Sequence, residues 1–183
     1  MHTAYYNDSG GMAVKTKTEN ARCLHLSDVH ISGSQSYDES RLFRSLCESL
    51  PRLEKRYGRP DFIVFSGDVA KTGSAIEYQH ATNFFEKLMG VTGITKDKLF
   101  IVPGNHDVDR QKNIGLSRVL NTRVESDKLF GGNPVPQIAS RMNNFKEWYE
   151  LFFENKREFS TTTTIQNPVE IKINGLEIFI WQI

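Results

Sequence analysis

Three short polar clusters in the sequence each hold an aspartate, and two of them also hold a histidine. They are Asp28-Val29-His30, Gly67-Asp68 and Gly104-Asn105-His106-Asp107. Carboxylates and imidazoles bind divalent cations and transfer protons. One such cluster alone is weak evidence, because these residue types are also common in ordinary turns. Three clusters together favour a shared ligand site over three unrelated turns.

Each cluster follows a short strand-like run that contains apolar residues, over residues 22–27, 62–65 and 99–102. The length of these runs, their branched side chains and the Gly and Pro residues that end them predict buried strands rather than helices. If the strands are parallel, all three clusters lie at their carboxyl ends. That edge of a parallel sheet is where ligands bind in α/β folds.

Helical patterns separate the three predicted strands. The first runs from Glu39 towards Tyr57, and the second begins at a Ser74-x-x-Glu77 capping box and ends near Gly90 or Gly93. A β-α-β-α-β order implies parallel strands joined by right-handed crossovers, with helices covering the sheet. We expect Pro51 to kink the first helix or to split it in two. Five apolar residues at helical spacing are expected to face the sheet: Leu42, Phe43, Leu46, Leu50 and Leu53.

The ordered set Asp-x-His, Gly-Asp and Gly-Asn-His-Asp resembles the first three motifs of the calcineurin-like metallophosphoesterase family, and the likeness spans residues 22–110. The resemblance implies an α/β fold in which β-sheets form a sandwich flanked by helices. The family continues with another histidine and a Gly-His-x-His motif, whereas His106 is the last histidine here. We therefore expect residues 21–183 to be the amino-terminal portion of such a domain.

The resemblance also implies a role for each motif residue. Asp28 and His30 would bind a first metal ion, Asp68 would bridge two ions, and Asn105 would bind the second. His106 would not be a ligand but would act near the leaving-group oxygen, as proton donor or transition-state stabiliser. The ligand set suits two divalent ions, with Mn²⁺ as first choice and Fe or Zn²⁺ as alternatives, because no thiolate motif is present.

The activity that the resemblance implies is phosphoester hydrolysis by a metal-bridging hydroxide. A nucleotide phosphodiesterase or a nuclease is the leading interpretation, with a phosphoester, nucleotide or nucleic acid as substrate. The alternatives are a phosphomonoesterase, and a non-catalytic sensor or interaction module with a vestigial metal site. Because family ligands are missing, we expect this chain alone to bind metal weakly and to be inactive or nearly so.

One position departs from the family pattern. Many members carry Asp where this chain has Lys71, and that Asp orients the catalytic histidine. Here the orientation of His106 must come from elsewhere, either from Asp107 or from a backbone carbonyl. Lys71 and Arg110 could contact a substrate phosphate, or they could be solvated surface charges.

Beyond Arg110 the pattern is less specific. Residues 111–160 are interpreted as a helical insertion beside the site, either a lid or an ordinary core helix with its aromatic stripe over residues 137–155. Asn174-Gly175 predicts a hairpin between strands at 169–173 and 176–183. The chain stops inside this apolar strand, which favours a continuation or a fused domain after Ile183.

Composition sets the remaining limits. The 183 residues are 38% hydrophobic and 25% charged, which is ordinary for a protein with one substantial core. A net charge of +1 gives no electrostatic case for a polyanionic partner. No apolar run reaches the ~20 residues that span a bilayer, so no membrane is expected. Residues 1–20 are interpreted as a disordered polar lead-in, and two cysteines fit free thiols in the cytoplasm.

Overall fold

A three-stranded parallel sheet forms the centre of the protein. The computed structural model describes residues 4–6, 12–14, 20–34, 37–109, 112, 122–125, 140–161 and 168–180. The strands are β3 (Cys23–Leu26), β4 (Phe62–Ser66) and β5 (Leu99–Val102), in the order β3-β4-β5. The predicted α/β fold and its parallel strand order are confirmed, and all three polar clusters leave the sheet at one edge.

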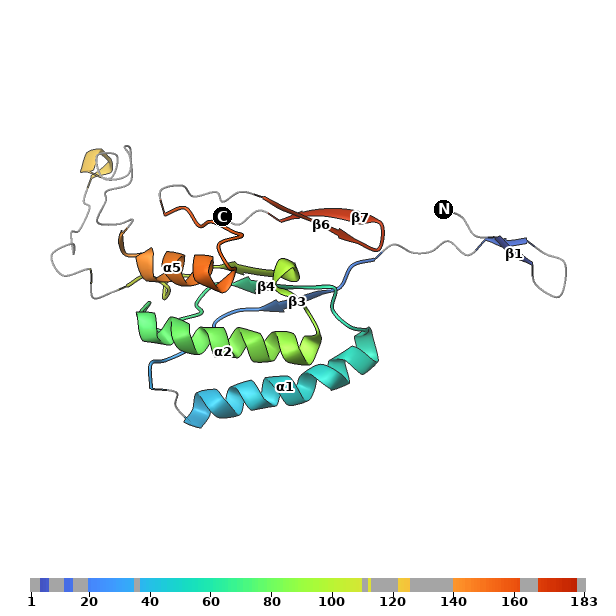
Figure 1. Cartoon of the computed structure of the whole chain (residues 1–183), viewed down its shortest axis with the longest axis horizontal. Helices are drawn as coiled ribbons and strands as arrows, with labels where there is room; N and C mark the ends of the chain where they lie inside the picture. Colours follow the sequence, from blue (N-terminus) through green and yellow to red (C-terminus); the bar gives the residue numbers. More distant parts are fainter. Residues whose placement is uncertain are drawn as a thin grey trace.

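Three helices cover one face of this sheet (Figure 1). They are α1 (Tyr37–Tyr57), α2 (Ala75–Thr92) and α5 (Asn143–Phe152), and a short 3₁₀ helix, η1 (Lys96–Lys98), leads into β5. Strand side chains alternate between faces, so Ile63 and Phe65 of β4 point into this helical layer. The core there is rich in aromatic rings: Phe65, Tyr78, Phe84, Phe85, Phe145, Trp148, Tyr149 and Phe152.

A β-hairpin lies against the other face of the sheet. Its strands are β6 (Val169–Ile173) and β7 (Leu176–Ile180), paired antiparallel as the Asn174-Gly175 turn predicts. Both turn residues have positive φ, 52° and 90°, which Asn and Gly tolerate best. Ile171 and Ile173 of the hairpin pack with Phe62 and Phe100 of the sheet in a second, smaller core.

Helix α2 begins and ends as its sequence predicts. The Glu77 side chain accepts a hydrogen bond from the main-chain N–H of Ser74 at 3.1 Å, which is the reciprocal half of a capping box. At the other end Gly93 adopts a left-handed conformation (φ 68°) and donates its N–H to the Met89 carbonyl. These two caps fix the start of α2 next to the loop that follows β4.

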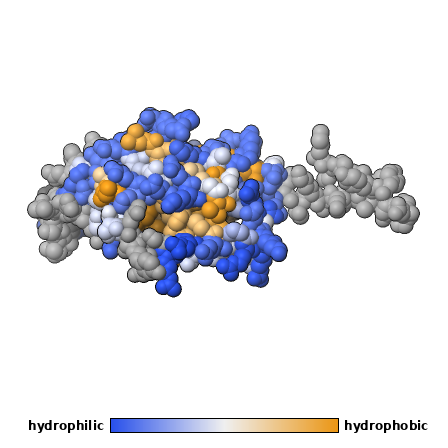
Figure 2. Space-filling model, turned by 60° about the horizontal axis from the view of Figure 1, so that its bottom comes forward, coloured by the Kyte–Doolittle hydropathy of each residue, from blue (hydrophilic) through white to orange (hydrophobic). Residues whose placement is uncertain are grey.

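Helix α1 differs from expectation at two of its leucines. It runs as one helix through Pro51, which excludes the split, one of the two outcomes expected there, while the kink stays a prediction. Leu42 and Leu53 are 62% and 45% exposed, whereas Phe43, Leu46 and Leu50 pack against the core. Leu42 and Leu53 lie along one margin of the apolar stripe, and the helix turns the other margin to the sheet. Figure 2 shows hydrophobic residues on this side of the molecule among a mainly hydrophilic surface.

The predicted helix over 137–155 is present as the shorter α5, and its aromatic face is part of the main core. Phe145 and Tyr149 are fully buried, and Trp148 packs beside Phe85 of α2. The core-helix interpretation therefore holds for α5. Residues 113–121 and 126–139 lie outside the described residues, so the lid remains a prediction.

The amino-terminal segment contains two short paired strands, β1 (Ala4–Tyr6) and β2 (Met12–Val14). They are the only parts of residues 1–19 that are described, so the disordered lead-in remains a prediction. Among the described helices, none combines the length and apolarity needed to cross a membrane.

Candidate metal centre

The loops after β3 and β4 lie side by side beyond the ends of their strands. Asp28 donates its N–H to the Gly67 carbonyl at 3.1 Å, and His30 donates its N–H to the Asp68 carbonyl at 3.0 Å. The parallel ladder thus continues past the strands into the first two polar clusters. This pairing sets the register in which Asp28, His30 and Asp68 meet.

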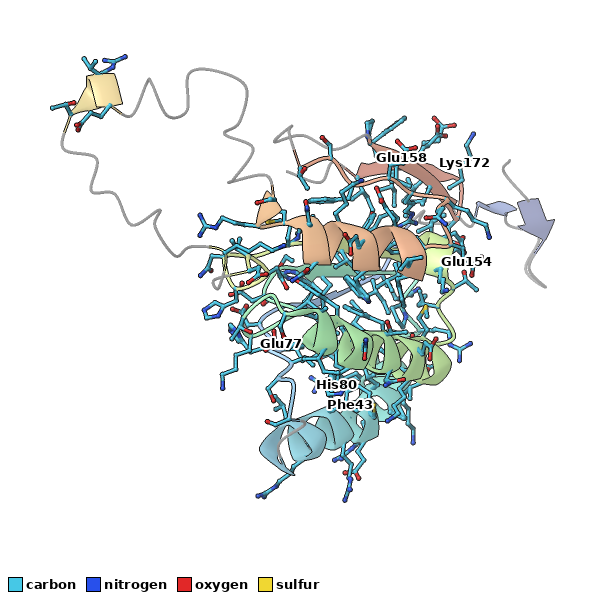
Figure 3. The ribbon with its side chains drawn as sticks, turned by 60° about the vertical axis from the view of Figure 1, so that its left-hand side comes forward. Phe43, Glu77, His80, Glu154, Glu158 and Lys172 are labelled. Atoms are coloured by element: carbon cyan, nitrogen blue, oxygen red, sulfur yellow. The ribbon has the colours of Figure 1, made fainter. Side chains whose placement is uncertain are left out.

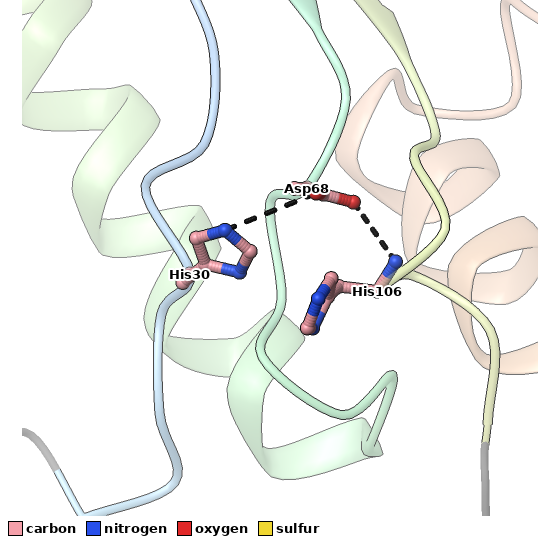
Figure 4. A group of neighbouring side chains, drawn as sticks. All are labelled: His30, Asp68 and His106. Carbon is pink, nitrogen blue, oxygen red and sulfur yellow. Dashed lines mark hydrogen bonds and ion pairs between the residues drawn. The ribbon is translucent and has the colours of Figure 1, made fainter.

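The side chains of these clusters converge on one small volume (Figure 4). His30 Nε2 lies 3.8 Å from Asp28 Oδ1 and 3.8 Å from Asp68 Oδ2. One ligand atom each from His30, Asp68 and His106 lies within 4.8 Å of the others. The two imidazole rings meet edge to face, with centroids 4.5 Å apart.

All three residues expected to bind the first ion have left-handed backbone conformations. The φ angles are 58° at Asp28, 48° at His30 and 56° at Asp68. Non-glycine residues rarely adopt positive φ, and such strain clusters at functional sites when surrounding contacts enforce it. Here the main-chain bonds between the two loops enforce it, and the turned backbone lets Asp28 and His30 reach the same point.

The third cluster is pressed against Asp68. His106 donates its main-chain N–H to Asp68 Oδ1 at 2.8 Å. Gly104 has no room for a side chain, because a Cβ there would lie 2.1 Å from Asp68 Oδ1 and 2.4 Å from Asp68 N. Glycine at this position therefore allows the turn after β5 to contact the predicted bridging carboxylate directly.

A backbone carbonyl orients the His106 ring. His106 Nδ1 lies 2.8 Å from the main-chain oxygen of Lys71. A carbonyl oxygen can only accept, so Nδ1 carries the hydrogen. Of the two sources proposed for this orientation, the backbone carbonyl is correct and Asp107 is not.

Asp107 instead points away from the cluster and is fully buried. It accepts hydrogen bonds from the main-chain N–H groups of Val69 and Ala70, at 3.1 and 2.8 Å. Burial raises the pKa of the Asp107 carboxyl, against the opposing effect of its hydrogen bonds from Gly104, Ala70 and Val69.

The remaining predicted residues are less constrained. Asn105 sits between Gly104 and His106 and is exposed on the same rim, so its place beside Asp68 is set by its neighbours. Lys71 is also exposed, whereas Arg110 lies outside the described residues. The ligand role of Asn105 and the phosphate contacts of Lys71 and Arg110 remain predictions.

The donor set fits a divalent transition-metal ion. Imidazole nitrogens and carboxylate oxygens gather at the carboxyl edge of the sheet, where Asp68 is 9% exposed and Asp28 is largely exposed. Separations near 4 Å between donor atoms leave space for an ion among them, and this mixture of ligands suits Mn²⁺, Fe or Zn²⁺.

Two further histidines form hydrogen bonds near the cluster, one to a loop and one between strands, which the sequence did not reveal. His80 of α2 shares a hydrogen bond of 3.0 Å with the Ser32 carbonyl, in the loop after His30, and lies between α1 and α2 (Figure 3). His25 Nε2 lies 2.7 Å from Ser66 Oγ on neighbouring strands. No sequence signal could have found these pairs, because their members are far apart in the chain.

A polar hollow lies at the opposite end of the strands. Its lining includes η1, which precedes β5, as well as Lys156 and Lys172. Lys172 forms ion pairs with Glu170 and Glu177, at 3.5 and 3.0 Å. Figure 3 shows Lys172 and Glu158 near β6 and β7. The charges there are largely matched, which makes this hollow a poorer candidate for catalysis than the histidine–aspartate cluster.

Comparison with known proteins agrees with this geometry. An uncharacterized metallophosphoesterase-like protein of Bacillus subtilis is 29% identical over 140 residues, which are 75% of this chain and 27% of that protein. A cAMP/cGMP dual specificity phosphodiesterase of Mycobacterium tuberculosis is 34% identical over 90 residues, 46% of this chain and 26% of that protein. A probable glycerophosphodiester phosphodiesterase of Arcobacter nitrofigilis is 24% identical over 86 residues, 46% of this chain and 29% of that protein.

This chain thus spans roughly a quarter of the length of these curated relatives. The calcineurin-like phosphoesterase model matches residues 21–181, a range that includes all three polar clusters and the β6–β7 hairpin. Because this match covers most of the chain, the chain belongs to the calcineurin-like phosphoesterase family.

Proposed function

We propose that this chain supplies the first metal-binding strand ends of a metal-dependent phosphodiesterase. The observation that carries this proposal is the convergence of His30, Asp68 and His106 within 4.8 Å at the carboxyl edge of the sheet. Asp28 adjoins them through His30. A chance set of turn residues would have no reason to aim two imidazoles and a carboxylate at one point.

In this proposal Asp28 and His30 would hold a first divalent ion, Asp68 would contribute to both ions, and Asn105 would hold the second. The ions, with Mn²⁺ preferred, would lower the pKa of a water between them and neutralise charge on the phosphoryl oxygens. The protein contributes fixed positions: the loop hydrogen bonds hold Asp28 and His30, and the His106 N–H holds one oxygen of Asp68.

His106 acts as the proton donor to the leaving-group oxygen. Its Nδ1 hydrogen is directed at the Lys71 carbonyl, so Nε2 is the ring nitrogen that exchanges a proton with substrate. The carbonyl fixes both the tautomer and the plane of the ring. A fixed donor adds a rate advantage because its orientation is set before the reaction begins.

We favour a phosphodiester as substrate, and a nucleotide in particular. Two relatives bear phosphodiesterase names, one for glycerophosphodiesters and one for cAMP and cGMP. A small nucleotide also fits the net charge of +1 better than a long nucleic acid, which basic surfaces attract. Nuclease activity, phosphomonoester hydrolysis and a non-catalytic role are the outcomes that the assay below would distinguish.

The test is an assay of the complete natural protein with Mn²⁺. Bis-p-nitrophenyl phosphate and p-nitrophenyl phosphate are compared, with cyclic AMP and single-stranded DNA as biological substrates. Faster diester than monoester cleavage that Asp68→Asn abolishes supports the proposal. Equal rates for wild type and Asp68→Asn would overturn it, and a monoester preference would reassign the substrate.

We further propose that residues 1–183 alone bind metal more weakly than the complete protein. The first ion would have three ligands here (Asp28, His30 and Asp68), and the second only Asp68 and Asn105. Calorimetry that finds two tight Mn²⁺ ions on this chain would contradict this.

The cytoplasm is the proposed compartment, since both Cys23 and Cys47 are free thiols.

A further inference from the structure

Asp107 has the lowest exposure of the charged residues in the described part of the chain, at 0%. It contributes no ligand atom to the histidine–aspartate cluster. A carboxylate buried in this way costs free energy unless hydrogen bonds replace its water. Its role must therefore be sought in the groups that it binds.

Four donors surround the Asp107 carboxylate. Oδ1 accepts from Ala70 N at 2.8 Å and from Tyr78 Oη at 3.1 Å. Oδ2 accepts from Val69 N at 3.1 Å and from Gly104 N at 2.8 Å. Every contact is a donor, so the site matches an acceptor-only group.

Three of these donors belong to the two loops that carry the proposed ligands. Val69 and Ala70 directly follow Asp68, and Gly104 directly precedes Asn105. One carboxylate thus holds the loop after β4 against the turn after β5. The two loops already touch at Gly104 and Asp68, where there is no space for a side chain.

The Tyr78 hydroxyl connects this carboxylate to the helical layer. It donates to the Asp107 main-chain oxygen at 3.0 Å as well as to Oδ1, and the Tyr78 ring is 1% exposed. That ring stacks on Trp148 of α5, with centroids 5.2 Å apart. The core therefore limits how far Tyr78, and with it Asp107, can move.

We propose that Asp107 is a positioning residue that sets the distance between Asp68 and the pair Asn105 and His106. This inference rests on the proposed function of the cluster. Asp107 touches neither metal nor substrate, and it acts through the main chain of Val69, Ala70 and Gly104. Small displacements of groups that bind metal or donate protons are costly, which gives a remote carboxylate a measurable effect.

Asp107→Asn tests the proposal in the complete natural protein. An amide of nearly the same shape must direct its NH₂ group at one pair of donors, so the loops separate. We expect Mn²⁺ affinity by calorimetry and kcat each to fall about 10- to 100-fold, the usual cost of losing such a support. KM should change little, because no substrate contact is removed. Tyr78→Phe removes one donor of four and should show a smaller loss in the same direction.

The matched control is Leu88→Ala. Leu88 is fully buried at the other end of α2, so this variant lowers the melting temperature without touching the loops. Its Mn²⁺ affinity and kcat, measured well below melting, should equal those of wild type. If Asp107→Asn binds Mn²⁺ as tightly as wild type does, the inference is overturned. If Asp107→Asn does not fold, the Mn²⁺ affinity of Tyr78→Phe decides in its place. A wild type without esterase activity would instead refute the proposed function, while the Mn²⁺ titration would still test Asp107.

Discussion

The Nδ1 atom of His106 lies 2.8 Å from the main-chain oxygen of Lys71, so a backbone carbonyl orients the predicted catalytic ring. The expectation that a side chain orients this histidine came from the aspartate that many family members carry at this position, whereas any residue offers a carbonyl. The identity of residue 71 is thereby uncoupled from the orientation of His106. Lysine can occupy the position without loss of the ring's hydrogen-bond acceptor.

The first prediction compares the effects on kcat of substituting His106 and Lys71. His106→Asn should lower kcat about 100- to 10,000-fold, the usual contribution of a positioned proton donor. Lys71→Gln should change kcat by less than about threefold, because it keeps the carbonyl and removes only a surface charge. Steady-state kinetics on a phosphodiester with an alkyl leaving group measures both. A comparable loss in the two variants would mean that the Lys71 side chain itself takes part.

The second prediction concerns the contact between Gly104 and Asp68. Gly104→Ala places a Cβ against the Asp68 carboxylate and main chain, so the loops must separate. We expect Mn²⁺ affinity to fall about 10- to 100-fold. Gly90→Ala is the control, because a Cβ at Gly90 in α2 meets nothing within 4 Å. That variant should raise stability by about 1 kcal/mol and leave Mn²⁺ binding unchanged. Undiminished Mn²⁺ affinity in Gly104→Ala would show that this contact does not matter.

The third prediction concerns Arg157, which joins the end of α5 to the start of β5. Its guanidinium donates to the carbonyls of Leu99 and Asp97, at 2.6 and 2.8 Å, and lies 4.4 Å from the Phe153 ring centroid. Arg157→Lys cannot reproduce this planar fork, so the free energy of unfolding should fall by about 1–3 kcal/mol.

Urea denaturation measures the effect of Arg157→Lys. Lys156→Ala is its control, since the Lys156 side chain is 77% exposed and its ion pair with Glu154 is on the surface. The control should unfold at the same urea concentration as wild type. If both variants behave alike, the carbonyl contacts of Arg157 add nothing to stability.

The sequence predicted the parts of the fold that depend on local pattern. Apolar runs ended by Gly or Pro gave the three parallel strands, and Ser74 and Glu77 gave the start of α2. The Asn174-Gly175 turn gave the hairpin. These features are set by residues within a few positions of one another, which is why a single sequence is enough to find them.

What the sequence could not predict depends on contacts between distant residues. The apolar stripe of α1 is wide enough to face the sheet in two orientations, and packing chose the one that exposes Leu42 and Leu53. Similarly, the sequence alone does not distinguish Asp107 from an ordinary turn residue, because its buried partners Ala70 and Tyr78 are 37 and 29 positions away. The carbonyl that orients His106 cannot be identified from the sequence, because every residue has a main-chain carbonyl.

The last prediction concerns pH and the segment after α5. Glu150 forms an ion pair with Lys146 and accepts the Phe159 N–H at 3.1 Å. The Lys146 hydrogen bond, assisted by Phe159, holds the pKa of Glu150 below its ordinary value. The unfolded chain therefore takes up this proton first as pH falls. The stabilisation by Glu150 is complete above the ordinary pKa of about 4.3 and is lost as pH falls through the lower, folded value.

Glu150→Gln should consequently lower the melting temperature more at pH 7 than at pH 3. Glu147→Gln, at an exposed position of the same helix, is the matched control. Differential scanning calorimetry from pH 3 to pH 7 measures the difference between each variant and wild type. For Glu150→Gln that difference should grow as pH rises through the acid range, since only an ionised carboxylate pairs with Lys146. A difference for Glu150→Gln that is constant with pH would show that the ion pair adds nothing beyond a neutral hydrogen bond.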